Sequence, residues 1–331
     1  MSASQFSVKN PRLFLAPMEG VTDWAMRDLL TEVGGIDQCV TEFLRITDTL
    51  MPPSVFEKNC PELKTGSRTR SGTPVFIQLL GGQAEPLAMN AARAVDLGAL
   101  GIDLNFGCPA PTVNRHDGGA TLLKYTDRIF KIVKTVRSAV PPLVPVTAKI
   151  RLGFDDPSAC LENAKAIEEA GATWLTVHCR TKTDGYKPPA YWEWVPSLKE
   201  AVKFEIVTNG EIWSLEDFKN CQETAQTPSY MIGRGALRNP FIFKNIKEVV
   251  PGTFQGTKVP GTEKSVRKLV PKFFESSVLY GKHEAFAVAR TKVWLKQLAL
   301  SDPEFESIFD EVKVLTKAPE FKETLYRRLE V

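Results

Sequence analysis

The chain contains 331 residues, of which 43% are hydrophobic and 24% are charged, and its formal net charge is +3. These values are ordinary for a globular protein and argue against the disordered, collagen-like and disulfide-scaffold classes, while the length suits one large domain and one small domain. No apolar run approaches the roughly 18 residues of a membrane-spanning helix, and the N-terminus carries no secretory signal, so we expect a cytoplasmic protein without a membrane partner.

Short apolar runs rich in β-branched residues alternate with amphipathic helical stretches between residues 13 and 246. This alternation is typical of repeated strand and helix units that build a parallel sheet. Eight strands are predicted, at 13–17, 39–43, 75–80, 101–107, 144–150, 173–178, 205–210 and 230–235. Eight such units predict an α/β fold, a TIM (β/α)8 barrel over residues 1–248.

An open Rossmann sheet is the alternative fold, and it would need the pattern GxGxxG directly after the first strand. The sequence there reads APMEGVTD instead. The GxG at Gly233 and Gly235 has Arg238 where the third glycine would stand. The dinucleotide-binding pattern therefore fails, and the barrel is favoured.

A second region follows the barrel. Residues 249–261, VVPGTFQGTKVPG, are rich in proline and glycine and predict a linker. Residues 262–331 show helical periodicity without a strand-like run, so we predict a small, all-helical C-terminal domain. Trp294 is predicted in the core of this domain rather than on its surface as a platform for a nucleic-acid base.

Charge is unevenly distributed within the helical domain. Residues 262–300 hold eight Lys or Arg against three Asp or Glu, whereas 301–331 hold five against eight. Arg290, Lys292 and Lys296 are the candidates for contacts with nucleic-acid phosphates, because neutralisation of phosphates by basic side chains dominates such binding. A solvated helix face is the commoner role of such charges and stays the alternative.

In a TIM barrel the functional site lies at the C-terminal ends of the strands. The residues that follow the predicted strands are Pro17, Met18, Glu19, Glu42, Gln78, Asn105, Cys108, Lys149, Arg151, His178, Arg180, Asn209, Gly210, Glu211, Gly233 and Arg234. Loops after the seventh and eighth strands often bind phosphate, and here they read TNGEI and MIGRGA. Each glycine alone suits a tight turn equally well, but both loops together, with the forked cation of Arg234, predict a bound phosphate.

Lys149 and Cys108 carry the remaining chemistry. Lys149 ends an otherwise apolar strand, where a lone ammonium is costly, so it either faces a ligand or forms a structural ion pair. Cys108 follows the fourth strand and precedes a long loop to Leu123, a position from which a thiol can donate a proton. A nucleophilic cysteine would need a paired histidine, and neither His116 nor His178 can be assigned that role from sequence. Six cysteines without a CxxC pair and three histidines without metal-ligand spacing predict that there is no metal site.

Seven segments, in this order, resemble the motifs of the tRNA-dihydrouridine synthase family. They are APMEGVTD (16–23), FIQLLGG (76–82), DLNFGCPAPTVNR (103–115), KIRLG (149–153), VHCRT (177–181), NGEI (209–212) and MIGRGA (231–236). Four further segments are most similar to the bacterial C-type subgroup, which modifies uridine at position 16 in the D-loop of tRNA. They are VTEFLRITDTL (40–50), CPEL (60–63), VARTKVWL (288–295) and FDEVKVL (309–315).

The resemblance implies that the barrel binds FMN, which NADPH reduces, and that tRNA is the partner of a monomeric enzyme. The implied contacts with FMN are Ala16, Pro17, Met18, Gln78, Lys149, His178, Asn209, Gly210, Glu211, Gly233 and Arg234. A hydride would pass from FMN to C6 of a uracil ring, and Cys108 would donate a proton to C5. The implied contacts with the uracil or the tRNA are Arg45, Asn105, Arg115, Tyr186, Arg290, Lys292 and Lys313.

Two other functions stay open on the sequence. An FMN-dependent barrel oxidoreductase could act on a free pyrimidine or an enone, but the added helical domain counts against it. A tRNA-binding protein could have lost catalysis, but the intact Cys108 and Lys149 count against that.

Overall fold

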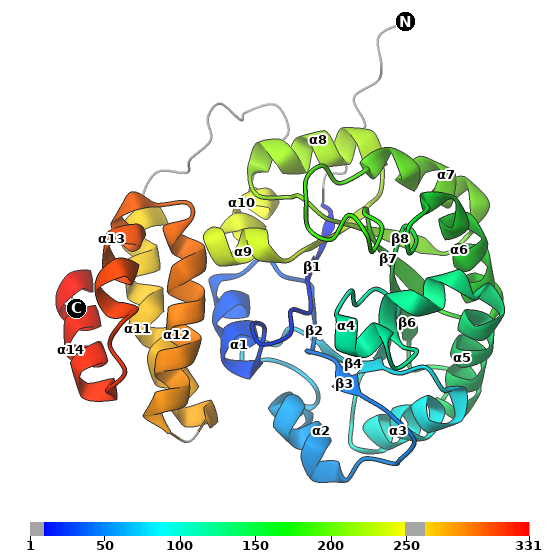
Figure 1. The fold of residues 1–331 in the computed structure, drawn as a ribbon, viewed down its shortest axis with the longest axis horizontal. Helices are drawn as coiled ribbons and strands as arrows, with labels where there is room; N and C mark the ends of the chain where they lie inside the picture. The colour runs from blue at the N-terminus through cyan, green and yellow to red at the C-terminus, as the bar shows by residue number, and fades with distance from the viewer. Residues whose placement is uncertain (1–9, 249–261, 282, 331) are drawn as a thin grey trace, which may run out of the picture.

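The computed structural model describes residues 10–248, 262–281 and 283–330 (Figure 1). These residues form one parallel sheet of β1 (Arg12–Leu15), β2 (Gln38–Val40), β3 (Leu44–Arg45), β4 (Val75–Leu80), β5 (Ile102–Asn105), β6 (Val146–Arg151), β7 (Trp174–His178), β8 (Glu205–Asn209) and β9 (Ser229–Ile232). The order along the sheet is β2-β1-β9-β8-β7-β6-β5-β4-β3, and a further pairing of β2 with β4 closes the sheet. The predicted TIM barrel is confirmed.

The eight predicted strands correspond to β1, β2 and β4 to β9, and β3 was not predicted. In β3, Leu44 and Arg45 pair with Leu79 and Leu80 at the end of β4. Two residues are too few to show the alternation by which a strand is found in a sequence. The predicted second strand also ran too far, because its last residues already belong to the loop that leads to β3.

Helices join consecutive strands, and most of them surround the barrel (Figure 1). They are α1 (Trp24–Val33), α2 (Pro53–Asn59), α3 (Ala84–Asp96), α4 (Pro111–Asn114), α5 (Thr126–Ala139), α6 (Cys160–Glu169), α7 (Val195–Ala201), α8 (Leu215–Ala225), α9 (Arg234–Arg238) and α10 (Ile242–Glu248). Short 3-10 turns occur at Pro61–Thr65, Gly119–Lys124, Pro157–Ala159 and Trp192–Trp194. Asp23 begins α1 by accepting a hydrogen bond from the Met26 amide at 3.0 Å, a cap that satisfies an otherwise unpaired donor of the first turn.

The interior of the barrel changes from apolar to polar along the strands. The interior holds one apolar cluster: Phe14, Ala16, Val40, Phe76, Trp174, Val207 and Met231. Because side chains of a strand alternate between its two faces, the residues two positions farther on also point inward. On β4, β7 and β8 these residues are Gln78, Thr176 and Asn209. One end of the barrel is therefore closed by packing, and the other end carries polar groups.

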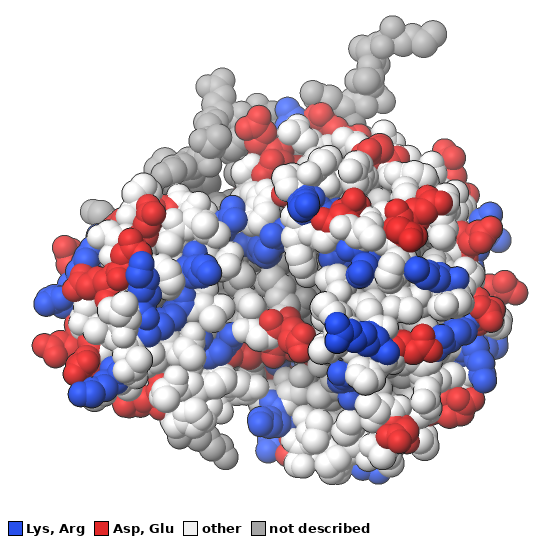
Figure 2. Space-filling model, in the orientation of Figure 1, with Lys and Arg blue, Asp and Glu red and all other residues white. Residues whose placement is uncertain are grey.

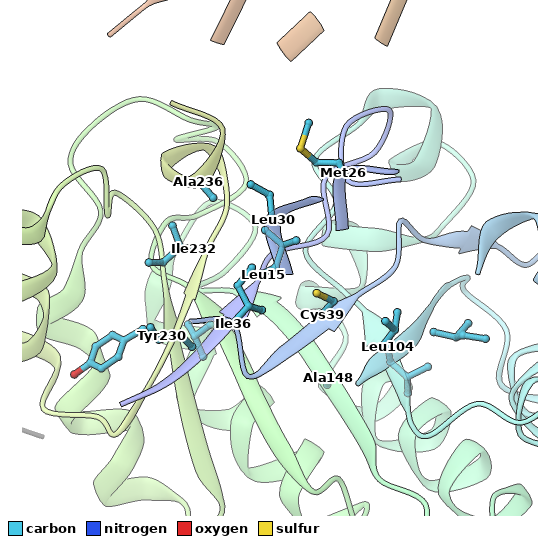
Figure 3. Close-up of a cluster of buried hydrophobic side chains, with 14 of the residues drawn as sticks. Leu15, Met26, Leu30, Ile36, Cys39, Leu104, Ala148, Tyr230, Ile232 and Ala236 are labelled. Atoms are coloured by element: carbon cyan, nitrogen blue, oxygen red, sulfur yellow. The ribbon is translucent and has the colours of Figure 1, made fainter. Parts of the chain in front are cut away.

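The outward faces of the strands pack against the helices (Figure 3). Leu15, Cys39, Leu104, Ala148 and Ile232 of the strands lie in one buried cluster with Met26 and Leu30 of α1 and Ala236 of α9. Each side chain contributes stability through the apolar area that it removes from water, about 25 cal/mol per Å². All six cysteines are buried free thiols.

The helices α11 (Thr262–Gly281), α12 (Glu284–Ala299), α13 (Pro303–Val312) and α14 (Ala318–Leu329) form a bundle beside the barrel (Figure 1). Trp294 of α12 is 1% exposed, contacts the Phe273 ring edge-on, and donates a hydrogen bond to the Leu237 carbonyl of α9 at 3.0 Å. Its predicted place in the core is confirmed. The predicted linker, 249–261, lies outside the described residues. Among the helices that the structure describes, none has the length and apolar character needed to cross a membrane.

Candidate active site

Two adjoining cavities open at the C-terminal ends of the strands. The larger, about 560 Å³, is lined by Gln78 of β4, Asn105 of β5, Cys108 just beyond β5 and Gln297 of α12, among others. The smaller, about 100 Å³, lies between the loops after β8 and β9. The two cavities share Pro17, Met18, Lys149, His178, Tyr186 and Arg234. Every residue that the resemblance implies for FMN lines one cavity or both.

Glycines allow the loops after β8 and β9 to approach each other and the smaller cavity. A side chain at Gly235 would place its Cβ 2.1 Å from the Ile212 carbonyl oxygen, so only glycine fits there. Gly210 has a φ of +124°, and a Cβ there would lie 3.1 Å from the ring of His178. Glu211 also has a positive φ, of 60°, which is uncommon for a residue with a side chain. The loop after β8 thus has backbone conformations that residues with side chains rarely adopt, and the loop after β9 packs too closely for a side chain at Gly235.

The smaller cavity holds more positive than negative charge. Lys149, Arg180 and Arg234 line it, and among its described lining residues Glu211, which pairs with Arg180, is the one carboxylate. Burial lowers the pKa of Arg180 and of Arg234, and for Arg180 the nearby charge of Arg234 lowers it further. A bound anion would reduce this electrostatic cost. The residues therefore fit a phosphate group such as that of FMN.

Lys149 and His178 form the wall between the two cavities. Lys149 Nζ donates to Asn209 Oδ1 at 3.1 Å, and the described residues place no carboxylate within ion-pair distance of it. Burial, followed by the charge of Arg151, lowers the pKa of Lys149 to about 8. Burial, followed by the charges of Arg151, Lys149, Arg180 and Arg234, holds the pKa of His178 well below its ordinary value, so its imidazole is neutral at pH 7. Because His178 Nε2 lies 3.2 Å from an Arg180 nitrogen, which can only donate, its proton belongs on Nδ1.

Cys108 lies at the start of the loop after β5 and is 8% exposed on the wall of the larger cavity. Its backbone is held at both ends: its N–H donates to Asn105 Oδ1 at 3.0 Å, and its carbonyl accepts from Asn114 Nδ2 and from the Ala120 amide, each at 3.0 Å. Burial raises the pKa of the Cys108 thiol, which is therefore protonated at neutral pH. No histidine in the described part of the chain forms a hydrogen bond with Cys108 Sγ. A protonated thiol without a histidine partner fits the role of an acid better than that of a nucleophile.

Two arginines and two aromatic rings border the cavities. Arg151 donates from Nε to the Gly107 carbonyl at 2.9 Å and lies 5.2 Å from the centre of the Tyr186 ring. Arg234 lies 4.8 Å from the centres of both the Tyr186 and the Trp213 rings. Tyr186 itself is 55% exposed at the mouth of the site. An exposed ring backed by two guanidinium groups is available for stacking by a planar ligand.

Arg290 of α12 lies against the loop between β1 and α1. It is 8% exposed, and its Nε donates to Asp23 Oδ2 at 2.7 Å. Its other two nitrogens donate to the carbonyls of Gly20 and Val21 in the loop between β1 and α1. In this structure the donors of Arg290 are thus occupied by groups of the barrel, so Arg290 joins the helical domain to the barrel. Its predicted contact with tRNA stays a prediction.

The remaining residues predicted to contact tRNA fall into two groups. Lys292 Nζ donates to the Lys313 carbonyl at 2.9 Å, and the Lys313 side chain pairs with Asp310 at 2.6 Å, so both lysines are engaged within the helical domain. Arg45, the last residue of β3, and Arg115, directly after α4, are both exposed near the C-terminal ends of the strands. Figure 2 shows Lys and Arg side chains on both sides of the hollow between the barrel and the helical domain.

Comparisons with known proteins identify the family of this chain. The family model "Dihydrouridine synthase (Dus)" matches residues 14–329. The chain belongs to the dihydrouridine synthase family. The "tRNA-dihydrouridine(16) synthase" of Neisseria meningitidis serogroup B is 44% identical over 95% of this chain and 93% of that protein. The protein of the same name from Pseudomonas putida is 46% identical over 91% of this chain and 92% of its own length.

Solved structures of other proteins share the barrel at low sequence identity. The old yellow enzyme homologue of Zymomonas mobilis has a TM-score of 0.51 at 13% identity, over 76% of this chain and 91% of that chain. Histamine dehydrogenase from Rhizobium sp. 4-9 has a TM-score of 0.55 at 15% identity, over 82% of this chain and 50% of that chain. These likenesses support the fold. The predictions of a barrel and of membership in the dihydrouridine synthase family are both confirmed.

Several residues that line this dihydrouridine synthase site were not among the predicted contacts, including Arg180, Trp213 and Gln297. Arg180 follows β7 and pairs with Glu211, and its place at a strand end was a usable signal. Trp213 donates from Nε1 to Glu211 Oε1 at 2.7 Å, and Gln297 reaches the larger cavity from α12. Neither follows a strand directly, so the sequence offered no sign of their position.

Proposed function

We propose that this chain reduces a uridine of the tRNA D-loop, at position 16, to 5,6-dihydrouridine, with FMN as its cofactor and NADPH as the reductant. One observation carries the proposal. A cavity with excess positive charge, lined by Arg180 and Arg234, shares a wall with a cavity that holds the protonated thiol of Cys108. The names of the relatives from Neisseria meningitidis and Pseudomonas putida support the target position.

FMN, when bound, supplies the hydride that adds to C6 of the uracil ring. The loops Asn209 to Glu211 and Gly233 to Arg234 would hold its phosphate, because they bring backbone N–H groups and a guanidinium to the cavity of excess positive charge. Lys149, on the wall between the cavities, would stabilise negative charge on the cofactor ring. Gln78 would contact the pyrimidine edge of that ring.

Cys108 completes the reduction. Hydride addition at C6 leaves negative charge toward C5, and the ring becomes saturated when C5 gains a proton. Cys108 Sγ–H donates that proton, and the resulting thiolate regains one from solvent. Because burial raises the pKa of the thiol, the acid form dominates before each turnover. The net change is the addition of one hydride and one proton across the C5–C6 bond.

The tRNA must present an unstacked base to a cavity that no base inside a helix could reach. Asn105 would hold the uracil, and Arg45, Arg115 and Tyr186 would guide the nucleotides around it. We place the domain boundaries at 1–248, 249–261 and 262–331. The protein would act as a metal-free monomer in the cytoplasm, where tRNA is available.

The deciding experiment incubates the purified, flavin-loaded protein with NADPH and unmodified tRNA, and then maps dihydrouridine by position. We expect dihydrouridine at position 16 and none in reactions without NADPH. Parallel reactions contain free uracil, free uridine or a simple enone at the same concentration. Turnover of a small molecule with unmodified tRNA left unchanged would refute the proposal in favour of a small-molecule reductase.

A further inference from the structure

Asp103 is a buried carboxylate inside the barrel that has no part in the reaction proposed above. It lies on β5, opposite Gln78 of β4 and Thr147 of β6, and is 2% exposed. Its Oδ2 accepts from Gln78 Nε2 at 2.7 Å, and its Oδ1 accepts from the Thr147 hydroxyl at 2.5 Å. Burial raises the pKa of Asp103, and both hydrogen bonds and the charge of Lys149 oppose that rise. Both carboxylate oxygens thus act as acceptors, which is the role of the ionised form.

The hydrogen bonds continue from Asp103 to the loop that carries the thiol. Gln78 Oε1 accepts from Asn105 Nδ2 at 2.9 Å. Asn105 Oδ1 then accepts from two backbone amides, those of Gly107 at 2.9 Å and Cys108 at 3.0 Å. A single directed chain of hydrogen bonds therefore begins at a carboxylate and ends at the backbone of Cys108.

The carboxylate at one end of this hydrogen-bond series and the backbone amides at the other end decide the orientation of the Gln78 and Asn105 side-chain amides between them. An amide side chain can turn over, because its oxygen and its NH2 group have nearly the same size and shape. An ionised carboxylate only accepts hydrogen bonds, so Asp103 requires Gln78 to present its NH2 group. A backbone N–H only donates, so Gly107 and Cys108 require Asn105 to present its oxygen. Both requirements are met only in the observed orientation.

We propose that Asp103 is a positioning residue: by fixing the orientation of the Gln78 and Asn105 amides, it holds the backbone of Cys108 and so places the thiol at the cavity. Its effect on catalysis rests on the proposed function, whereas its effect on the loop does not.

Asp103→Asn is the direct test. An amide at this position can donate as well as accept, so both neighbouring amides can turn over, and Asn105 would then present NH2 to two N–H donors. We expect hydrogen exchange at the Gly107 and Cys108 amides to accelerate about tenfold, the usual worth of one hydrogen bond. Reoxidation of the reduced flavin by tRNA should slow about tenfold.

Thr208→Val is the matched control. It removes a buried hydrogen bond between the Thr208 and Thr227 hydroxyls, 2.8 Å apart, and Thr208 lies on β8, outside the hydrogen-bond series from Asp103 to Cys108. Exchange at Gly107 and Cys108 should be unchanged in this variant. If exchange at Gly107 and Cys108 is also faster in the control, the loss of any buried hydrogen bond loosens the loop. The specific role of Asp103 would then be rejected.

A double variant, Asp103→Asn with Gln78→Glu, moves the carboxylate one position along the chain. The carboxylate can accept from both neighbouring amides, so it again requires Asn105 to present its oxygen to the loop. Exchange at Gly107 and Cys108 should return toward the wild-type rate, and this variant decides the question if the single variant does not fold. Unchanged exchange in the single variant, or fast exchange in the double variant, would overturn the proposal. A wild-type protein inactive on tRNA would instead count against the proposed function alone.

Discussion

The sequence shows charged side chains both at the barrel mouth and in the helical domain. In the structure those at the barrel mouth line the cavities, whereas most of those predicted on α12 bind groups of the protein itself. Lys149 and Arg234 line the cavities, as their places at strand ends predict. Arg290 and Lys292 instead bind carboxylate or carbonyl groups of the protein itself. A strand in a closed barrel has one inward face, so its period of two gives each side chain a direction. A helix that packs on several sides has no single buried face, so the sequence does not show whether a basic residue on it points to solvent or to the protein.

The largest effect is expected at the barrel mouth. Cys108→Ala should lower the rate of dihydrouridine formation by about 10²- to 10⁴-fold, the usual worth of a positioned general acid, with flavin content unchanged. Cys160→Ala is the control, because Cys160 is also a buried free thiol but lies on α6 outside both cavities. If Cys108→Ala forms dihydrouridine at the wild-type rate in a quantitative assay, Cys108 is not the general acid.

The next effect concerns the connection between the two regions. Arg290→Ala should lower the free energy of unfolding by about 3 to 5 kcal/mol, because it leaves the buried Asp23 without its partner. Arg267→Ala breaks a more exposed pair, with Glu304, and should cost less than about 1 kcal/mol. Denaturant titration measures both. Equal losses would mean that the Arg290 pair is no more than a surface ion pair.

Arg234→Ala should weaken FMN binding about 10- to 100-fold, since it removes a charge-assisted contact with the phosphate. Equilibrium dialysis of the cofactor-free protein gives the dissociation constants. Riboflavin, which lacks the phosphate, is the control ligand, and its affinity should not change. If both ligands lose affinity equally, Arg234 acts through the ring or through the fold of its loop.

Lys149 predicts a pH dependence of cofactor binding. Burial lowers its pKa to about 8, so it is charged below that pH and neutral above it. An anionic cofactor favours the charged form, so binding above this pKa takes up a proton, and FMN affinity should fall by up to about tenfold per pH unit as pH rises. Lys149→Met should flatten this dependence between about pH 7 and about pH 9. An equally steep dependence in this variant would assign the proton to another group.

The smallest effect is expected on the helical domain. Lys296 is exposed, and it is the one member of the three basic residues predicted on α12 that has no polar partner among the described residues. Lys296→Ala should weaken tRNA binding only a few-fold and reduce the slope of log affinity against log salt concentration by about one. A slope identical to that of the wild type would leave Lys296 as an ordinary solvated charge.

The barrel and its site were predictable because strand ends in a closed sheet converge. Gln78, Asn105, Lys149 and Asn209 lie on four strands far apart in sequence, yet all of them line the cavities. Pairings that cross between elements were not predictable. Gln297 reaches the larger cavity only because of how α12 packs against the barrel.

Burial of charge was equally hidden from the sequence. Arg290 stands in a basic segment whose composition suits RNA, and only the position of the loop between β1 and α1 shows that its partner is Asp23. Asp103 occupies a strand in which apolar and polar residues alternate, and its role emerges only from the register that sets it beside Gln78. Both cases depend on contacts between distant segments, which no local pattern encodes.

A stopped-flow experiment separates reduction of the flavin by NADPH from its reoxidation by tRNA. Cys108→Ala should slow reoxidation even at saturating tRNA and leave reduction unchanged. Lys296→Ala should change only the tRNA concentration at which reoxidation is half-maximal. Reoxidation of Cys108→Ala at the wild-type rate, with full yield of dihydrouridine, would contradict the assignment of the chemistry to this thiol at the barrel mouth.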